Sequence, residues 1–273
     1  MTNPPAFIKW AGGKRQLLEQ FKKFLPEQAE RYFEPFVGGG AVAFYIIQKN
    51  HLKEAYLSDI NKELINCYEV IRDNVEELIA KLSYHRKNHT PEYYYAIREL
   101  TPEILSKVER ASVFVYLNKT CFNGLYRVNS KGRFNVPIGS YKNPSIFQEE
   151  DLREISKMLK NVKILKMNFD KVLDYARRGD FIYFDPPYYP LKKGESFTTY
   201  TKENFLEKEQ RRLAEVFREL DKRGCKVMLS NSDTGFVKGL YHGFNISTVK
   251  ATRMINCDAT KRGAINEVVV TNY

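Results

Sequence analysis

A glycine triplet between a short apolar stretch and a helical pattern is the feature that most restricts the possible folds of this chain. Residues 31–36 (RYFEPF) are mostly apolar, VGGG follows, and residues 41–50 (AVAFYIIQKN) have the spacing of a helix. Residues 54–61 (EAYLSDIN) then predict a second strand, which closes on Asp59. A strand, a glycine turn, a helix and a strand that ends in an acid are typical of the first half of a doubly wound α/β domain.

The same alternation of strand and helix returns in the last third of the chain. Residues 162–170 (VKILKMNFD) predict a strand that ends in an acid, residues 170–179 a short helix closed by Gly179, and residues 181–185 (FIYFD) the next strand. One helix and then three strands are predicted to follow, over residues 203–224, 226–233, 244–251 and 265–272. Because consecutive strands are joined through helices, we expect a mainly parallel sheet that binds its ligands at the carboxyl ends of its strands.

Residues 61–159 do not follow this alternation. They contain several helical patterns and then, at residues 118–144, a turn-rich stretch in which NG, SKG and IGS separate short alternating runs. Such turns between alternating runs are typical of a β-hairpin. We therefore expect an α/β domain formed by residues 1–60 and 160–273, with helices and a hairpin inserted between its two parts.

The glycine turn and Asp59 together predict a site for a nucleoside. Glycines that open a helix let a ligand approach the backbone and the helix N-terminus. An acid at the end of the next strand can accept hydrogen bonds from a ribose diol. Asp59 could instead cap the helix that begins near Asn61. The pair therefore indicates a nucleoside cofactor without identifying it.

The sequence FDPPYY, residues 184–189, ends a predicted strand with an acid, two prolines and two aromatic rings. Pro186 and Pro187 remove backbone donors and fix φ, so the strand cannot continue and the segment is stiff. Asp185 and the carbonyl of Pro186 could each accept a hydrogen bond from the exocyclic amine of a planar base, which would draw the nitrogen lone pair out of conjugation. Tyr188 supplies a ring on which the base can stack, a contact that contributes about 1–3 kcal/mol per base.

The chain is strongly basic. Its formal net charge is +11, from 44 lysines and arginines against 33 acids. A protein with this charge most often binds a polyanion, and nucleic acid is the leading candidate. The alternative is a surface whose charge serves only solubility.

Cysteine spacing and hydropathy restrict the cellular location. The four cysteines are far apart and form no CxxC pair, which argues against a zinc ribbon or a disulfide framework and fits a reducing cytosol. The N-terminus lacks the pattern of a signal peptide and the apolar runs are too short to span a bilayer, so we expect a cytoplasmic protein with no membrane partner. His85 and His89 lie four residues apart but have no evident third ligand, and we expect no metal site.

The order of these motifs resembles that of DNA adenine-N6 methyltransferases of the Dam type, in the α group of amino-methyltransferases. The blocks that carry the resemblance extend over nearly the whole chain: FIKWAGGKRQLL, EPFVGGGAVAF, LSDIN, NGLYRVN, GRFNVPIGSYKNP, FDPPYYPL, FTTYTKENF, LSNSD and RGAINEVVVTNY. The resemblance implies a Rossmann-like methyltransferase sheet that uses S-adenosylmethionine, with the insertion as the DNA-recognition domain. It implies direct methyl transfer to N6 of an adenine that has been flipped out of double-stranded DNA. Because NGLYR and FNVPIGSYK fit members that read GATC, we expect that recognition site.

The resemblance also implies roles for individual residues. Catalysis would rest on Asp185, Pro186, Pro187 and Tyr188. Cofactor contacts would come from Trp10, Lys14, Glu34, Phe36, Gly38, Asp59, Phe169, Asp170 and Asp185. DNA contacts would come from Lys9, Asn123, Leu125, Arg127, Pro137 and Tyr141, with Arg127 on guanine O6 and N7.

Two further segments have expected roles at the DNA. Residues 191–205 correspond to a loop that would order only on DNA, and KRG at residues 261–263 is either a phosphate clamp or a solvated loop. A restriction endonuclease that acts on the same site is a possible partner, and the sequence leaves the oligomeric state open.

Four alternative functions are weaker. Cytosine-N4 methyltransferases use the same amine chemistry but more often carry serine at the position of Asp185. Enzymes that methylate RNA or a protein glutamine often read NPPY and do not need the hairpin insertion. A DNA-binding module without activity would not need every chemical residue to be present. A nicotinamide dehydrogenase would explain the glycine turn but not DPPY.

Overall fold

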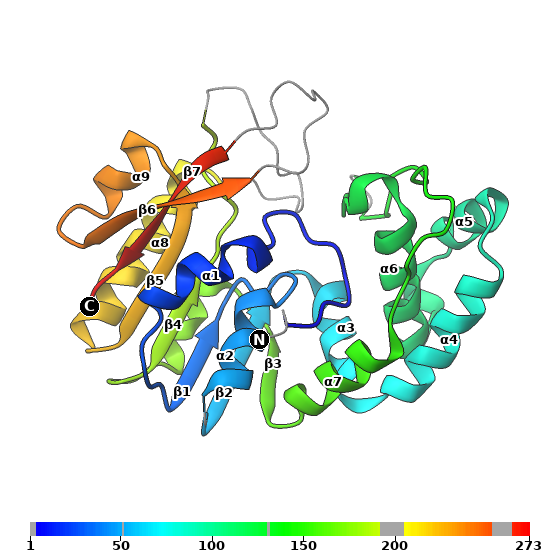
Figure 1. Cartoon of the computed structure of the whole chain (residues 1–273), viewed down its shortest axis with the longest axis horizontal. Helices are drawn as coiled ribbons and strands as arrows, with labels where there is room; N and C mark the ends of the chain where they lie inside the picture. Colours follow the sequence, from blue (N-terminus) through cyan, green and yellow to red (C-terminus); the bar gives the residue numbers. More distant parts are fainter. Residues whose placement is uncertain (1–3, 51, 130–131, 192–204, 253–263) are drawn as a thin grey trace.

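The computed structural model of the chain describes residues 4–50, 52–129, 132–191, 205–252 and 264–273. Within these ranges the molecule is centred on a seven-stranded sheet in the order β3-β2-β1-β4-β5-β7-β6 (Figure 1). The strands are β1 (Arg31–Glu34), β2 (Glu54–Asp59), β3 (Val162–Lys166), β4 (Phe181–Phe184), β5 (Lys226–Ser232), β6 (Asn245–Thr252) and β7 (Ala264–Thr271). All the strands predicted for the α/β domain are present, with ends that differ by a few residues.

The larger part of the sheet is parallel. Strands β3, β2, β1, β4 and β5 pair in parallel, so their carboxyl ends lie along one edge. Strand β7 runs antiparallel between β5 and β6. The chain proceeds from β1 to β2 and β3 on one side and from β4 to β5 on the other, and doubly wound sheets bind ligands at such a switch point. The expected Rossmann-like, mainly parallel sheet is confirmed.

Helices cover both faces of the sheet. They are α1 (Leu18–Phe21), α2 (Ala41–Lys49), α8 (Glu207–Lys222) and α9 (Gly235–Leu240), with the 3-10 helices η1 (Lys14–Leu17), η2 (Lys22–Phe24) and η5 (Phe169–Asp174). Successive strand residues point to opposite faces. Tyr32 accordingly belongs to the same buried cluster as Phe44 of α2, whereas Phe33 belongs to a second cluster with Phe217 of α8.

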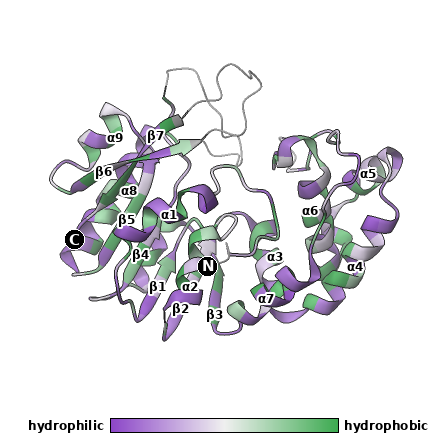
Figure 2. Ribbon diagram, in the orientation of Figure 1, coloured by the Kyte–Doolittle hydropathy of each residue, from purple (hydrophilic) through white to green (hydrophobic). Residues whose placement is uncertain are grey.

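The inserted helices are α3 (Lys62–Asp73), α4 (Val75–Lys87), α5 (Pro91–Arg98), α6 (Lys107–Thr120) and α7 (Glu149–Leu159), with the 3-10 helices η3 (Pro102–Ile104) and η4 (Phe122–Gly124). Local signals fix several of their starts: Asn61 caps α3, Thr90 caps α5 ahead of Pro91, and Ser106 forms a capping box with Glu109 in α6. In Figure 2 these helices carry both hydrophobic and hydrophilic stretches, as expected of helices with one face on a core. The cluster that contains Phe44 continues into α3, α4 and α6, so the insertion shares a core with the sheet.

The hairpin predicted within residues 118–144 is only partly formed. In the described residues of this stretch, which leave out 130 and 131, the chain pairs through two isolated antiparallel bridges instead of a continuous ladder. They join Cys121 to Ile138 and Val128 to Phe134. Pro137 has no N–H to donate to a ladder, which is one physical reason why the pairing stays local.

The helix predicted over residues 170–179 is also shorter than expected. It is the 3-10 helix η5, which the side chain of Asn168 caps by accepting a hydrogen bond from the Phe169 N–H over 2.8 Å. The segment buries few of its side chains, and short 3-10 turns are the usual form of such connectors. The helix ends at Asp174 with Tyr175 as its C-cap, so the predicted closure by Gly179 is wrong; Gly179, with φ of 87°, lies in the turn ahead of β4.

Part of the sequence-based expectations falls outside the described residues. These are the DNA-dependent loop at residues 192–204, the KRG segment at residues 261–263 and the first residues of the helix predicted from residue 203. Within the described ranges, no helix combines the length and the apolar character needed to cross a bilayer.

Candidate active site

Asp185 directly follows β4 at the carboxyl edge of the sheet, where β4 lies between β1 and β5. Its side chain is 20% exposed, and Nζ of Lys14 lies 2.8 Å from its Oδ1. The Ser230 hydroxyl donates to the same oxygen over 3.0 Å. Among the described residues both contacts fall on Oδ1, so Oδ2 is left to accept a hydrogen bond from a ligand.

Burial shapes the electrostatics of this carboxylate. It raises the pKa of Asp185 above its usual value, and Lys14 and Ser230 offset part of the rise. Lys14 is only 4% exposed, so the ion pair is poorly screened by water. The pair therefore holds the Asp185 carboxylate in one orientation.

Buried amides fix the backbone of the DPPYY segment. Gln210 of α8 donates from Nε2 to the carbonyl of Pro187 over 2.9 Å. Asn231 of β5 donates to Gln210 Oε1 over 3.0 Å and accepts from the Tyr189 N–H over 3.1 Å. In the described part of the chain, no donor contacts the carbonyl of Pro186. The segment thus carries two acceptors that no donor contacts among the described residues, Asp185 Oδ2 and the Pro186 carbonyl, on a backbone stiffened by the prolines and held by these amides.

The ring of Tyr188 lies beside the same ion pair. Nζ of Lys14 lies 4.6 Å from the ring centroid, within the range of a cation–π contact. The Tyr188 hydroxyl donates to Oε2 of Glu267 on β7 over 2.7 Å. Lys14, Asp185 and Tyr188, which the sequence assigned to one site, are therefore brought together.

The glycine turn after β1 is packed against Trp10. Gly38 has φ of 47°, and a Cβ placed on it would lie 2.7 Å from Cδ1 of Trp10. Trp10 also stacks on Tyr126 of the insertion, with ring centroids 5.9 Å apart. Trp10 thus bridges the glycine turn and the insertion, and is more than an aromatic residue at the edge of the sheet.

Asp59 lies next to this turn at the end of β2. Its carboxylate accepts hydrogen bonds from the Gly38 N–H over 3.4 Å and from the Asn61 N–H over 2.9 Å. The cap of α3 is Asn61, whose side chain accepts from the N–H groups of Glu63 and Leu64, so the structure assigns the capping role to Asn61 instead of Asp59. Burial raises the pKa of Asp59 to about 6.

Phe36, Phe169 and Asp170 form the other side of the switch point. The rings of Phe36 and Phe169 are stacked with centroids 5.4 Å apart. Asp170 pairs through Oδ2 with Arg212 of α8, while its Oδ1 is buried without a hydrogen-bond partner. An unpartnered buried acceptor beside two aromatic rings is well suited to a planar ligand that carries an amine.

Glu34 lies deeper than the other predicted cofactor residues. It is 3% exposed and accepts a hydrogen bond from the Tyr32 hydroxyl over 2.6 Å. Burial raises its pKa well above the usual value, with a further contribution from the charge of Asp185. In this position Glu34 can support the turn after β1 from the interior of the protein.

Asn118 of α6 joins the N-terminal segment to the insertion. Its side chain accepts from the Lys9 N–H over 2.7 Å and donates to the carbonyls of Lys9 and Gly124 over 2.8 and 3.1 Å. Nζ of Lys9 lies 4.1 Å from the ring centroid of Tyr141. Lys9 and Tyr141, two predicted DNA contacts far apart in the sequence, therefore lie side by side.

The other predicted DNA contacts lie in the surface segment that follows α6. Asn123 is exposed and in the left-handed conformation, with φ of 55°. Arg127 is exposed, and its Nε donates to Oδ1 of Asn135 over 2.8 Å. Pro137 is exposed as well, whereas Leu125 is half-buried.

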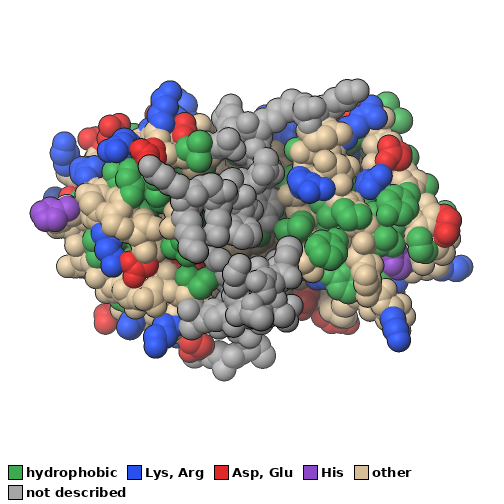
Figure 3. Space-filling model, turned by 90° about the horizontal axis from the view of Figure 1, so that it is seen from above, with side chains coloured by type: hydrophobic (Ala, Val, Ile, Leu, Met, Phe, Trp, Pro, Cys, Tyr) green, Lys and Arg blue, Asp and Glu red, His purple; other side chains and the backbone are tan. Residues whose placement is uncertain are grey.

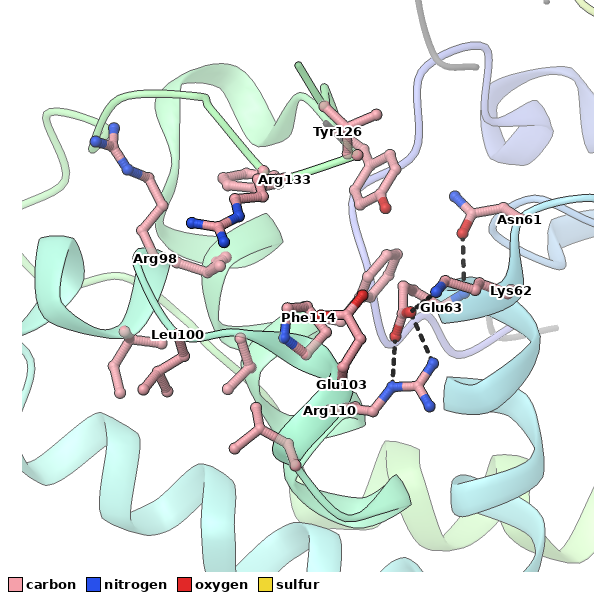
Figure 4. A pocket seen from close by; sticks show the side chains of 18 of the residues that line it. Asn61, Lys62, Glu63, Arg98, Leu100, Glu103, Arg110, Phe114, Tyr126 and Arg133 are labelled. Atoms are coloured by element: carbon pink, nitrogen blue, oxygen red, sulfur yellow. Dashed lines mark hydrogen bonds and ion pairs between the residues drawn. The ribbon is translucent and has the colours of Figure 1, made fainter. Parts of the chain in front are cut away.

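A separate cavity of about 460 Å³ lies within the insertion, between the start of α3, the end of α5, η3, α6 and the segment after α6 (Figure 4). Asn61, Phe114 and Tyr126 border it, together with Glu63 and Arg110, whose ion pair has an N–O distance of 2.7 Å. None of the predicted cofactor residues lines this cavity. It is therefore distinct from the Asp185 site, although Phe114 and Tyr126 of its lining both contact Trp10, with ring centroids 6.5 and 5.9 Å apart.

The two histidines at the end of α4 and just after it contact hydroxyl groups. His85 contacts the Tyr93 and Ser112 hydroxyls over 2.8 and 3.2 Å, and His89 contacts the Tyr116 hydroxyl over 2.7 Å. Burial, together with the charge of nearby Lys81, lowers the pKa of His85 to about 4. Over the described ranges, no group of three or more His, Cys, Asp or Glu side chains is arranged to hold a metal ion.

Several residues of the site were not assigned by sequence reasoning. They are Ser230, Asn231, Gln210 and Glu267 around the DPPYY segment, and Asn118 and Tyr126 at the junction with the insertion. The run SNS within a strand that is otherwise apolar was the available signal for the first two, because a buried strand carries polar residues only where partners exist.

Comparison with known proteins gives one consistent result. A family model described as D12 class N6 adenine-specific DNA methyltransferase matches residues 10–255. The chain is 49% identical to Type II methyltransferase M.MjaIII of Methanocaldococcus jannaschii, over 98% of this chain and 98% of that protein. It is 45% identical to Type II methyltransferase M1.LlaDCHI of Lactococcus lactis subsp. cremoris, over 98% and 95%. It is 34% identical to the DNA adenine methylase of Escherichia coli (strain K12), again over 98% and 95%.

Proposed function

The chain belongs to the family of D12 class N6 adenine-specific DNA methyltransferases, and we propose that it methylates N6 of the adenine in GATC after extruding that base from duplex DNA. The observation that carries the proposal is the pair of open acceptors at the end of β4, Asp185 Oδ2 and the Pro186 carbonyl. Because the family is adenine-specific, the cytosine-N4 alternative is not favoured, and neither is a nicotinamide dehydrogenase.

The residues at the carboxyl edge of the sheet fit S-adenosylmethionine, which supplies an electrophilic methyl group when bound. Asp59 can accept hydrogen bonds from a ribose diol, and the glycine turn leads directly into the N-terminus of α2, whose N-cap is Gly40. Phe36 and Phe169 offer ring faces, and Asp170 offers a buried acceptor with no present partner. We propose that these residues, with Trp10, hold the cofactor.

The chemical work of the protein is to make an aromatic amine nucleophilic. Its lone pair is normally delocalised into the purine ring. If Asp185 Oδ2 and the Pro186 carbonyl each accept one N–H, the amine is held out of the ring plane and the lone pair is localised. Lys14 and Ser230 hold the carboxylate in place, and the prolines hold the carbonyl. Alignment of this kind can lower the free-energy barrier to methyl transfer by about 7–11 kcal/mol.

An adenine inside a stacked duplex cannot reach Asp185 and the Pro186 carbonyl, so the base must be extruded. The net charge of +11 supports binding to the phosphate backbone. Lysine and arginine side chains occur over both the sheet domain and the inserted domain in the view from above (Figure 3). The specificity for GATC is proposed from the NGLYR and FNVPIGSYK blocks and from the similarity to DNA adenine methylases.

Two relatives are named Type II methyltransferases. We therefore propose that this enzyme acts in the cytoplasm as the methylating member of a restriction–modification pair, with a restriction endonuclease of the same site as its partner.

The experiment that tests the proposed function is a map of modified bases. The protein is incubated with S-adenosylmethionine and unmethylated genomic DNA, and the DNA is then sequenced by a method that detects N6-methyladenine and N4-methylcytosine. We expect N6-methyladenine in GATC alone. Methylation of adenine in another context would refute the proposed site, and N4-methylcytosine would refute the proposed base.

Substitution of Arg127 by alanine should relax specificity at one base pair. Asn135 holds the guanidinium at the surface, and a bidentate contact of arginine with guanine contributes about 1–3 kcal/mol of discrimination. In the wild type, methylation of GATC should be faster than methylation of a site in which the guanine is replaced. In Arg127→Ala this rate ratio should shrink by the factor that corresponds to this free energy. Arg133→Ala, which removes a cation from the same segment, is the matched control and should weaken all DNA sequences alike. Equal loss on all sequences for Arg127→Ala would make it a phosphate contact.

Cofactor affinity should depend on the charge of Asp59. Burial raises its pKa to about 6, and protonation turns one acceptor position into a donor and removes the charge that strengthens hydrogen bonds from a ribose diol. Affinity should therefore be constant well above about pH 6 and fall about tenfold per pH unit below it. Calorimetric titration with S-adenosylmethionine across this range measures the effect. Asp59→Asn should bind more weakly and lose the transition, and a transition that survives in Asp59→Asn would assign it to another group.

A further inference from the structure

Glu267 reaches the active edge of the sheet because β7 is antiparallel. It pairs in register with Ser232, the last residue of β5, and with Val249 of β6. The carboxyl ends of the parallel strands form the ligand-binding edge, so a residue near the start of an antiparallel strand arrives at the same edge. The direction of β7 thus places a carboxylate close to the DPPYY segment that follows β4.

The carboxylate of Glu267 is used there by Tyr188. The Tyr188 hydroxyl donates to Oε2 of Glu267 over 2.7 Å. Burial raises the pKa of Tyr188 well above its usual value, and the charges of Asp185 and Glu267 add to the rise, so the hydroxyl keeps its proton and acts as the donor. A hydrogen bond to an ionised acceptor is among the stronger ones in proteins.

The ring of Tyr188, in contrast to its hydroxyl, contacts the ion pair of Lys14 and Asp185. Nζ of Lys14 lies 4.6 Å from the ring centroid and 2.8 Å from Asp185 Oδ1. Tyr188, in the segment after β4, is therefore held at its hydroxyl by Glu267 of β7 and at its ring by Lys14. The same lysine orients the Asp185 carboxylate. Without the hydroxyl anchor, the contact with Lys14 alone would hold the ring, and other staggered rotamers would become accessible to it.

We propose that Glu267 is a positioning residue, which fixes the Tyr188 ring so that the extruded adenine stacks with its amine at Asp185 Oδ2 and the Pro186 carbonyl. The inference rests on the proposed function of the DPPYY segment. Glu267 itself touches neither the cofactor nor the reacting atoms in this account. Its effect passes through Tyr188, which makes the effect separable from that of Asp185.

A double-mutant cycle tests the inference. The variants are Glu267→Ala, Tyr188→Phe and the two combined, with Glu267→Gln as the conservative variant that keeps an acceptor. Single-turnover methyl transfer is measured with enzyme already saturated with duplex and S-adenosylmethionine. Binding constants for both ligands are measured separately, and thermal unfolding reports on the fold.

We expect Glu267→Ala and Tyr188→Phe each to slow single-turnover transfer by about tenfold, because each removes the same charge-assisted hydrogen bond. The combined variant should be no slower than either alone, since the cycle measures coupling between groups in contact. Glu267→Gln should recover most of the rate. The binding constants for cofactor and DNA should change by less than about twofold, because the proposed effect is on orientation.

Two results would overturn the inference while the proposed function stands. In the first, the wild-type protein methylates adenine and Glu267→Ala transfers the methyl group at the same single-turnover rate. The other is a loss for Glu267→Ala that persists in full on the Tyr188→Phe background, which would mean that Glu267 acts elsewhere. If Glu267→Ala fails to fold, an unchanged rate in Tyr188→Phe would overturn it equally. Failure of the proposed function has a different signature, namely a wild-type protein that does not methylate adenine.

Discussion

The variant Asp185→Asn is expected to lose about 10²–10³-fold in the rate of methyl transfer, the range seen when one preorganised electrostatic contact is removed. Lys14 and the Ser230 hydroxyl both donate to Oδ1 of Asp185. An asparagine would therefore turn its carbonyl oxygen towards these donors and its NH₂ group towards the ligand. A donor would then face the N–H groups of the adenine amine where the reaction needs an acceptor.

DNA binding should be largely retained in this variant, since it rests on cations and on residues of the insertion. Single-turnover transfer and salt-dependent DNA binding, measured on the same preparation, separate the two properties. Asp180→Asn is the matched control at the other end of β4. Asp180 is also buried and pairs with Arg31 over 3.5 Å, so this variant should lower the melting temperature and leave turnover per folded molecule unchanged. Wild-type turnover in Asp185→Asn would remove Asp185 from the mechanism.

The variant Gly38→Ala is expected to weaken cofactor binding by about tenfold. Gly38 has φ of 47°, and a left-handed conformation costs a residue with a Cβ about 1–2 kcal/mol. The new methyl group would also lie 2.7 Å from Cδ1 of Trp10, so the indole must move. Its stacking on Tyr126 would be disturbed with it, and aromatic pairs contribute about 0.5–1.5 kcal/mol.

Calorimetric titration with S-adenosylmethionine measures this loss directly. Gly179→Ala is the control, because Gly179 has φ of 87° and a Cβ there would meet nothing within 4 Å. It shares the backbone strain but lies away from Trp10, and should reduce stability while leaving cofactor affinity intact. If both variants bind the cofactor as the wild type does, the glycine turn is not the cofactor site.

The parallel sheet could be predicted from the sequence because its strands carry local signals. FIYF in β4 is buried on both faces and reads as a continuous apolar run, which is typical of a central parallel strand. Asp59 and Asp185 were recognisable as candidate site residues because each lies at the end of such a strand. Their position at one edge follows from the parallel topology alone.

The partners of Asp185 and Tyr188 could not be predicted in this way. Ser230 and Glu267 reach the site through the register of β5 and β7, and register depends on pairing between residues far apart in the sequence. A glutamate near the start of an apolar strand is indistinguishable, in sequence, from one that faces solvent. The same holds for Asn118, whose contacts with Lys9 become visible only when α6 packs against the N-terminal segment.

The insertion was predicted less completely than the sheet. A 3-10 helix forms at the predicted NG turn, but turn signals do not determine how many bridges form between them, and the described residues of 118–144 form isolated bridges. Helix α7 was not singled out, although Leu152, Ile155 and Leu159 have helical spacing and are buried. The roles proposed for Asn123, Leu125, Arg127 and Pro137 come from the resemblance, because exposure alone does not distinguish a base contact from a solvated side chain.

The most direct test is a crystal structure of the enzyme with duplex DNA that contains GATC and with a non-reactive analogue of S-adenosylmethionine. The DPPYY segment after β4 should hold the extruded adenine. The amino nitrogen of the adenine should lie within about 3.2 Å of both Asp185 Oδ2 and the Pro186 carbonyl oxygen. Its ring should stack on Tyr188. An adenine bound elsewhere in the protein, or one whose amine faces neither acceptor, would contradict the account.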